Sequence, residues 1–318
     1  MNKRERVRAA VAGAAVDRVP AGFWLHFPPA EQTGSAAVQA HLRFYRETDV
    51  DILKVMNEHL YQADITVRNP ADWRQIRAAP VTASFYQQQL DEIKQVCDAV
   101  GDEAMVIATV HGVFASAFHA SRSPEDTLAR GNPVSDHLHA DPEPVLAALD
   151  AVADSLAAFS LACLDAGAAG IYYAALGGES YRFSQEEFER YIKPYDLRVL
   201  RAIEGAGELN ILHICKDNVR LKPYADYPAH VVNWGENEDN PPLEEGRALF
   251  GRPILGGVHF RGPVVNGPES AIRDEVHGAL DRLGAQGLLL GADCTLPTST
   301  PYANIRAAVH AAATWPGN

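Results

Sequence analysis

The chain has 318 residues, of which 47% are hydrophobic and 22% are charged, so apolar side chains suffice for a large buried core. Its formal net charge of -13 argues against a nucleic-acid partner, because contacts with a phosphate backbone need clustered lysine and arginine. The four cysteines, Cys97, Cys163, Cys215 and Cys294, are too few and too scattered for a disulfide framework. These features predict a globular protein of the cytoplasm.

The first 18 residues begin with basic side chains but lack the apolar stretch of a signal peptide. Arg6, Arg8 and Asp17 interrupt this segment, which favours a short amphipathic helix. No uninterrupted apolar run elsewhere is long enough to cross a membrane, so we expect no membrane association. No linker-like composition divides residues 19–318, which predicts one barrel domain preceded by the helix of residues 1–18.

Eight short apolar runs follow one another along the chain, and each has the length of a buried strand. They cover residues 19–27, 50–57, 104–110, 169–176, 209–215, 230–235, 253–258 and 287–294. Helical patterns alternate with them at residues 35–48, 82–100, 143–166, 184–206, 243–249, 268–284 and 301–314. Ser184 before QEEFERYI, and Asp141-Pro142 before an Ala/Leu-rich segment, are signals for helix N-termini.

Continuous apolar strands that alternate with helices indicate a parallel sheet covered on both faces. Eight such units in one chain predict the fold class α/β, with a single (β/α)8 TIM barrel and a short N-terminal helix. A doubly wound open sheet is the alternative. No strand is followed by a glycine-rich phosphate-binding loop that leads into a helix, which weakens that alternative.

In a (β/α)8 barrel the functional residues lie at the carboxyl ends of the strands. We therefore collect the side chains at these ends that carry chemistry. In chain order they are His26, Asn57, His111, Glu179, His213, Cys215, Trp234, His259, Arg261 and Cys294.

His213 and Cys215 are two residues apart at the end of the fifth run, so a strand places both side chains on one face. Cys294 ends the eighth run, on the same rim of the barrel. One nitrogen and two thiolate ligands suit Zn²⁺, and a catalytic zinc site keeps a further position open. A lone histidine or cysteine at a strand end is more often a core residue. The pair on one face, with a third ligand on the same rim, favours a zinc site.

Four segments also resemble one known family: DRVP near the N-terminus, AGAAGIYYAALGGE followed by RFSQEEFERYIKPYD, LHIC, and LLLGADCTLPTSTPYANIRAAV near the end. Together they resemble the uroporphyrinogen decarboxylase superfamily over essentially the whole chain, most closely from residue 165 onward. The resemblance implies a (β/α)8 barrel, in agreement with the number of strands. It also implies one of two activities, because the superfamily contains metal-free porphyrinogen decarboxylases and zinc-dependent corrinoid methyltransferases.

The resemblance is closest to the methyltransferase branch, which moves a methyl group between a corrinoid protein and a thiol such as coenzyme M. That branch is marked by a His-x-Cys pair at the fifth strand and a distant cysteine, which His213, Cys215 and Cys294 match. Lys216 departs from the pattern, because glycine is frequent at that position. The decarboxylase branch has an arginine-containing segment after the first strand, whereas this chain has WLHFPPAEQTG there, without arginine.

The resulting expectation is a zinc-dependent methyltransferase that transfers a methyl group from a corrinoid, or a similar donor, to a small thiol activated on Zn²⁺. The corrinoid would come on a separate protein or free in solution, and barrels of this size often form homodimers. Three alternatives stay open. They are a metal-free decarboxylase, a zinc barrel with other carbon–sulfur chemistry, and a non-catalytic protein that binds a small molecule or a corrinoid.

Further site residues are predicted from their positions at the strand ends. A fourth zinc ligand or substrate contact is expected from Glu179, His26, His111 or His259. Trp234 would either stack on a planar substrate or cap the barrel core. Arg261 would bind an anionic group of the substrate, and Asn57 is a further candidate for substrate binding.

Overall fold

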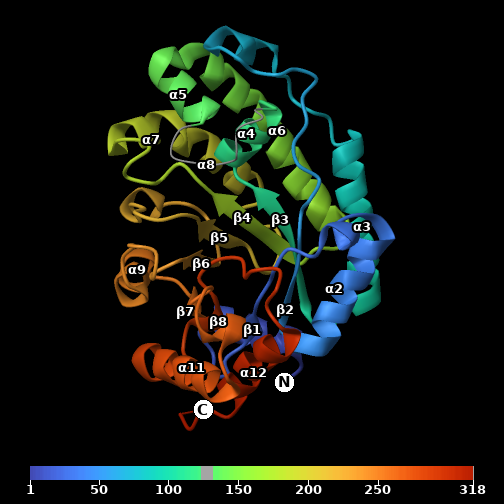
Figure 1. The fold of residues 1–318 in the computed structure, drawn as a ribbon, viewed down its shortest axis with the longest axis vertical. Helices are drawn as coiled ribbons and strands as arrows, with labels where there is room; N and C mark the ends of the chain where they lie inside the picture. Colours follow the sequence, from blue (N-terminus) through green and yellow to red (C-terminus); the bar gives the residue numbers. More distant parts are fainter. Residues whose placement is uncertain (123–131, 318) are drawn as a thin grey trace.

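The structure is a computed structural model that describes residues 1–122 and 132–317. Eight parallel strands close into a barrel in chain order, with β1 paired to β8, and helices surround them (Figure 1). The predicted (β/α)8 barrel is confirmed, and the open-sheet alternative is wrong. The strands are β1 (Ala21–Gly22), β2 (Ile52–Val55), β3 (Met105–His111), β4 (Gly170–Ala175), β5 (Ile211–Ile214), β6 (Val231–Trp234), β7 (Ile254–Val258) and β8 (Leu288–Ala292).

The helices around the barrel follow the predicted pattern with three exceptions. The predicted helix over 184–206 is divided into two, because Pro194 lies in the first turn of the second and has no amide hydrogen to continue the first. The N-terminal helix ends at Val11, well before residue 18. Three short helices over 113–120, 133–140 and 263–266 were not predicted, because they are too short to show a clear periodicity.

The α-helices are α1 (Lys3–Val11), α2 (Gly34–Thr48), α3 (Ser84–Val100), α4 (Val113–Ala120), α5 (Pro133–Ala140), α6 (Pro142–Asp165), α7 (Gln185–Tyr191), α8 (Lys193–Ala202), α9 (Leu243–Phe250), α10 (Pro263–Asn266), α11 (Glu269–Leu283) and α12 (Tyr302–Ala313). Short 3₁₀ helices cover Pro29–Glu31, Pro70–Gln75 and Lys222–Tyr224. Ser184 caps α7 in a capping box, as its position in the sequence predicted.

The basic N-terminus is fixed to the amino-terminal end of the barrel by a buried ion-pair network. Asp51, which precedes β2, is fully buried and accepts hydrogen bonds from Arg6 and Arg18, each at 2.6 Å. The amide of Ala21 donates to the same carboxylate at 2.8 Å. The network links α1, β1 and β2 at the end of the barrel that normally carries stability rather than catalysis.

Helix α6 is long and apolar enough to cross a membrane by length and composition only, although Asp150 and Asp154 interrupt its apolar sequence. Half of its apolar window is buried inside the fold, where it packs against α8 and β4. That burial is typical of a core helix in a soluble barrel. The cytoplasmic location stays a prediction.

Neighbouring tyrosines on β4 show which strand positions face the barrel interior. Tyr172 points inward, and its ring stacks on His213 at 5.3 Å between centroids. Tyr173 points outward and donates to Asp196 on α8. The opposite directions follow from the strand period of two, and they place the inward set beneath the barrel mouth.

Candidate metal centre

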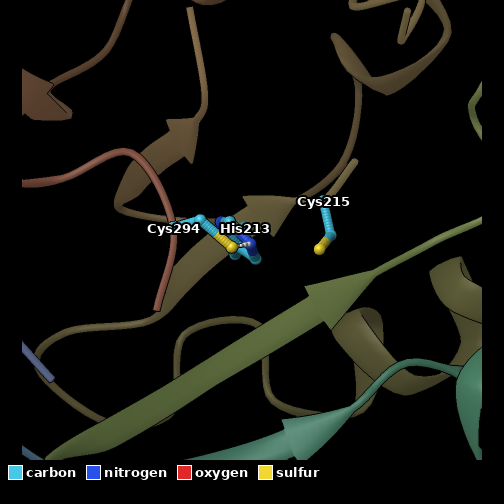
Figure 2. A group of neighbouring side chains, drawn as sticks. All are labelled: His213, Cys215 and Cys294. Atoms are coloured by element: carbon cyan, nitrogen blue, oxygen red, sulfur yellow. Dashed lines mark hydrogen bonds between the residues drawn. The ribbon is translucent and has the colours of Figure 1, made fainter. Parts of the chain in front are cut away.

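His213, Cys215 and Cys294 meet at the carboxyl-terminal mouth of the barrel. Their ligand atoms all lie within 4.8 Å of one another, and His213 Nε2 is 3.8 Å from Cys294 Sγ. The amide of Cys215 donates to the Ala175 carbonyl at 3.0 Å, so the extended backbone of β5 continues to Cys215. Figure 2 shows the three side chains pointing into one space from β5 and from the segment after β8.

The imidazole of His213 is held with Nε2 towards the two sulfurs. Asn233, its register partner on β6, donates through Nδ2 to two carbonyl oxygens, those of Leu255 at 2.9 Å and Ala292 at 3.3 Å. The oxygen Oδ1 of Asn233 therefore faces His213 Nδ1, at 2.6 Å. Since Oδ1 can only accept, Nδ1 carries the hydrogen and Nε2 presents its lone pair to the site.

The pKa values of the two thiols are shifted in opposite directions. The hydrogen bond between them raises the pKa of Cys215, and burial acts in the same direction. The same hydrogen bond lowers the pKa of Cys294, although burial acts in the opposite direction. One thiolate thus forms readily at the position where a cation would bind.

The three ligands fit Zn²⁺ in chemistry, and one pair of them also fits in spacing. With Zn–S near 2.3 Å and Zn–N near 2.0–2.1 Å, a tetrahedral site separates nitrogen from sulfur by roughly 3.6 Å. The 3.8 Å between His213 Nε2 and Cys294 Sγ is close to that value. The hydrogen bond from Nδ1 to Asn233 is the outer contact that zinc-binding histidines normally make.

Two cavities adjoin the three ligands, and both are lined by all of them. The inner cavity, about 280 Å³, extends into the barrel past Lys54, His111 and Tyr172. The rim cavity, about 340 Å³, lies among the loops that follow β5 to β8, including Phe260 and Arg261. A metal held by the three ligands would therefore be accessible from two directions.

The four predicted candidates for a further ligand lie elsewhere around the mouth. Within residues 1–122 and 132–317, no other His, Cys, Asp or Glu joins the group of three. His26 and His111 line the inner cavity, and His26 Nδ1 is 2.5 Å from Glu58 Oε1. His259 lies 3.3 Å from Asp293, outside both cavities. Glu179 is fully buried, accepts a hydrogen bond from the Gly177 amide and pairs with Arg182.

The predicted substrate contacts divide between the two cavities, with one exception. Asn57 lines the inner cavity, and Arg261 lines the rim cavity beside Glu238, 3.1 Å away. Trp234 lines neither cavity. It is fully buried, donates to the Pro241 carbonyl at 2.8 Å and packs against Phe250 of α9. The prediction that Trp234 stacks on a substrate is therefore wrong, and Trp234 has the alternative role in the core.

The sequence did not single out Lys54, and it placed Asn233 at the end of the sixth run without assigning it a role; both residues belong to the site. Lys54 lies in β2 and lines the inner cavity, and Asn233 lies in β6 and orients His213. Each is a single polar residue inside an apolar strand, in VDILKVMN and HVVNWG. Burial of a polar group in a barrel interior costs free energy. An isolated polar residue in an apolar strand is therefore a signal of function that the sequence offered.

Removal of the Asn233 side chain should weaken metal binding without removing a ligand. We expect Asn233→Ala to lower zinc affinity roughly 10- to 100-fold, because His213 loses the acceptor that fixes its ring and tautomer. Competition with a chromophoric chelator measures the change. Tyr172→Phe is the matched control, since it deletes the other hydrogen bond to Asn233 Oδ1, at 3.2 Å, and should leave affinity nearly unchanged. Equal affinities of Asn233→Ala and wild type would contradict the proposed orientation.

Comparison with known families shows the family to which the chain belongs. The family model described as uroporphyrinogen decarboxylase (URO-D) matches residues 62–315, so the chain belongs to the URO-D family. A search of curated proteins found no match.

Several solved structures share the fold. A methyltransferase from Methanosarcina mazei has a TM-score of 0.78 at 18% identity, with 98% of each chain covered. A B12-independent methionine synthase from Shewanella, in complex with selenomethionine, has a TM-score of 0.62 at 12% identity, covering 93% of this chain and 97% of the other. A putative vitamin-B12-independent methionine synthase from Listeria monocytogenes has a TM-score of 0.53 at 13% identity, covering 86% and 84%. Identities this low show a common fold.

Proposed function

We propose that this protein is a zinc-dependent methyltransferase whose acceptor is a small thiol. The observation that carries the proposal is the meeting of His213, Cys215 and Cys294 at the barrel mouth, with all ligand atoms within 4.8 Å. Two thiolates and a neutral imidazole make an electron-rich site, which favours a soft sulfur ligand as the further partner of the metal. The named activities of the structural neighbours, methyl transfer and methionine synthesis, support the same class.

Zinc bound to these ligands would supply Lewis acidity that depresses the pKa of a thiol below its free value of about 8.5. The residues of the chain hold the metal, orient its histidine ligand and line the cavity beside it. Cys215 and Cys294 hold the cation as thiolates, and Asn233 keeps His213 in the tautomer that presents Nε2. The apolar wall formed by Leu176, Met56 and Ala174 in the inner cavity limits the access of water.

Methyl transfer from a corrinoid balances in atoms and electrons. The thiol loses its proton, and its sulfur forms a bond to the methyl carbon as the cobalt–carbon bond breaks. The electron pair of that bond stays on cobalt, so the products are a methyl thioether, a Co(I) corrinoid and a proton. The methyl donor would be a corrinoid on a separate protein or a similar small donor, and the two cavities allow donor and thiol to approach from different sides.

An assay with defined reagents tests the activity. Zinc-loaded protein is incubated with methylcobalamin and a panel of thiols that includes 2-mercaptoethanol, 3-mercaptopropionate and homocysteine. We expect a methyl thioether by mass spectrometry and an equal amount of Co(I) corrinoid by absorbance, with both lost in Cys294→Ser. Cys163→Ser is the control, because Cys163 is buried in α6 away from the mouth.

Two outcomes would reject the proposal in different ways. Release of carbon dioxide from a porphyrinogen by metal-free protein would favour the decarboxylase alternative. Stoichiometric zinc with turnover of a different carbon–sulfur substrate would keep the metal site and replace the reaction.

A further inference from the structure

Lys54 lies in the middle of β2 with its side chain in the barrel interior, only 4% exposed. Its ammonium lies over two aromatic faces, 4.1 Å from the ring centroid of Tyr172 and 4.9 Å from that of Trp24. In the part of the chain that the structure describes, no side chain or carbonyl forms a hydrogen bond or ion pair with its Nζ. The aromatic faces favour a cation but provide no counter-charge.

The groups that face Lys54 across the inner cavity identify what its charge acts on. Glu58 is already hydrogen-bonded to His26 at 2.5 Å. His111 lines the same cavity as a neutral group, because burial lowers its pKa to about 3. Tyr172 and Thr109 are uncharged. The remaining anionic groups in contact with the cavity are the thiolates of the metal centre.

A count of charges shows what the cation can balance. Two cysteine thiolates cancel the charge of Zn²⁺, and His213 adds no charge, because a histidine that binds a metal through Nε2 does so as the neutral imidazole. The loaded centre therefore has no net charge, while the same cavity is lined by two lysines, Lys54 and Lys216, and by one carboxylate, Glu58, which leaves one positive charge without a partner. A thiol that enters as its thiolate adds one negative charge. Burial of that anion costs less with a cation in the same low-dielectric cavity.

Resting on the function proposed above, we infer that Lys54 is a positioning residue that stabilises the thiolate form of the substrate in the inner cavity. It acts on the charge of the sulfur and not on a second acidic group of the substrate. Burial lowers the pKa of Lys54 to about 7, and the nearby negative charges of Cys294, Glu58 and Cys215 oppose that shift. An anion in the cavity would therefore also favour the charged lysine.

The test measures thiol binding to the cobalt(II)-substituted protein by the thiolate-to-cobalt absorption band, without turnover. The probes are 2-mercaptoethanol, which is otherwise neutral, and 3-mercaptopropionate, which has an acidic tail. We expect Lys54→Met to weaken both probes about tenfold, the size of effect that one unit charge has over several ångströms in a partly buried site. Lys54→Gln is the second variant, with the same expected loss, if the methionine protein is unstable.

Lys3→Met is the matched control, because Lys3 Nζ also lies over a ring, 4.3 Å from the centroid of Tyr45, but at the opposite end of the barrel. It should bind both probes like wild type. Unchanged affinity in folded, cobalt-loaded Lys54→Met would overturn the inference, and so would a loss confined to 3-mercaptopropionate, which would make Lys54 a receptor for the acidic tail. If the wild-type protein bound neither cobalt nor thiol, the proposed function itself would be overturned.

Discussion

Replacement of Cys215 by serine is expected to lower zinc affinity by a hundredfold to a thousandfold and to abolish thiol methylation. Zinc sites in small domains gain roughly 10–16 kcal/mol over four ligands, so each ligand contributes about 3–4 kcal/mol. Serine keeps the size of the side chain but offers a hydroxyl, which is a much poorer zinc ligand than a thiolate. The affinity follows from chelator competition, and the turnover from the methylcobalamin assay.

The matched control is Cys97→Ser. Cys97 is also partly buried, but it lies on α3, and burial raises the pKa of its thiol to about 11. It should retain wild-type zinc affinity and activity. Full zinc binding by Cys215→Ser, or an equal loss in both variants, would show that the cysteines at the barrel mouth do not hold the metal.

The largest expected effect on stability lies at the opposite end of the barrel. Asp51→Ala should lower the free energy of unfolding by about 3–5 kcal/mol, because Arg6 loses its fully buried partner and Arg18 loses both of its contacts with that carboxylate. The amide of Ala21 also loses its acceptor. Urea denaturation followed by circular dichroism measures the change.

Asp98→Ala provides the comparison, since Asp98 forms an exposed i,i+4 pair with Lys94 and should change stability by less than about 1 kcal/mol. The folded fraction of Asp51→Ala should bind zinc with wild-type affinity, because the network is remote from the mouth. A stability equal to that of Asp98→Ala would mean that the buried network contributes little, and a loss of zinc from folded protein would mean that the two ends of the barrel are coupled.

Most of the architecture could be predicted from the sequence because parallel strands buried on both faces appear as continuous apolar runs. Runs such as AMVIATV and GLLLGADC are almost entirely apolar, and their ends lie within one residue of β3 and within two residues of β8, respectively. The prediction of one continuous helix over 184–206 was wrong at Pro194. The periodicity continues through this residue, but its missing amide hydrogen interrupts the helix. The short helix α4 gave no periodic signal.

The ligands could be predicted more readily than their surroundings. His213 and Cys215 are close in sequence, so the strand period alone places them on one face. The partner of His213 depends on the register between β5 and β6, which brings Asn233 beside it and turns the next residue, Trp234, towards α9. The exposure of Lys54 to the inner cavity likewise depends on how β2 lies in the closed barrel. Register and closure are set by packing of the whole barrel, which no local pattern encodes.

The most direct test of the metal centre is elemental analysis of the purified wild-type protein combined with X-ray absorption at the zinc edge. A site of two cysteines and one histidine predicts about one zinc per chain, with two sulfur ligands near 2.3 Å and a nitrogen ligand near 2.0–2.1 Å. Absence of zinc after incubation with the metal, or a shell of oxygen and nitrogen without sulfur, would contradict it.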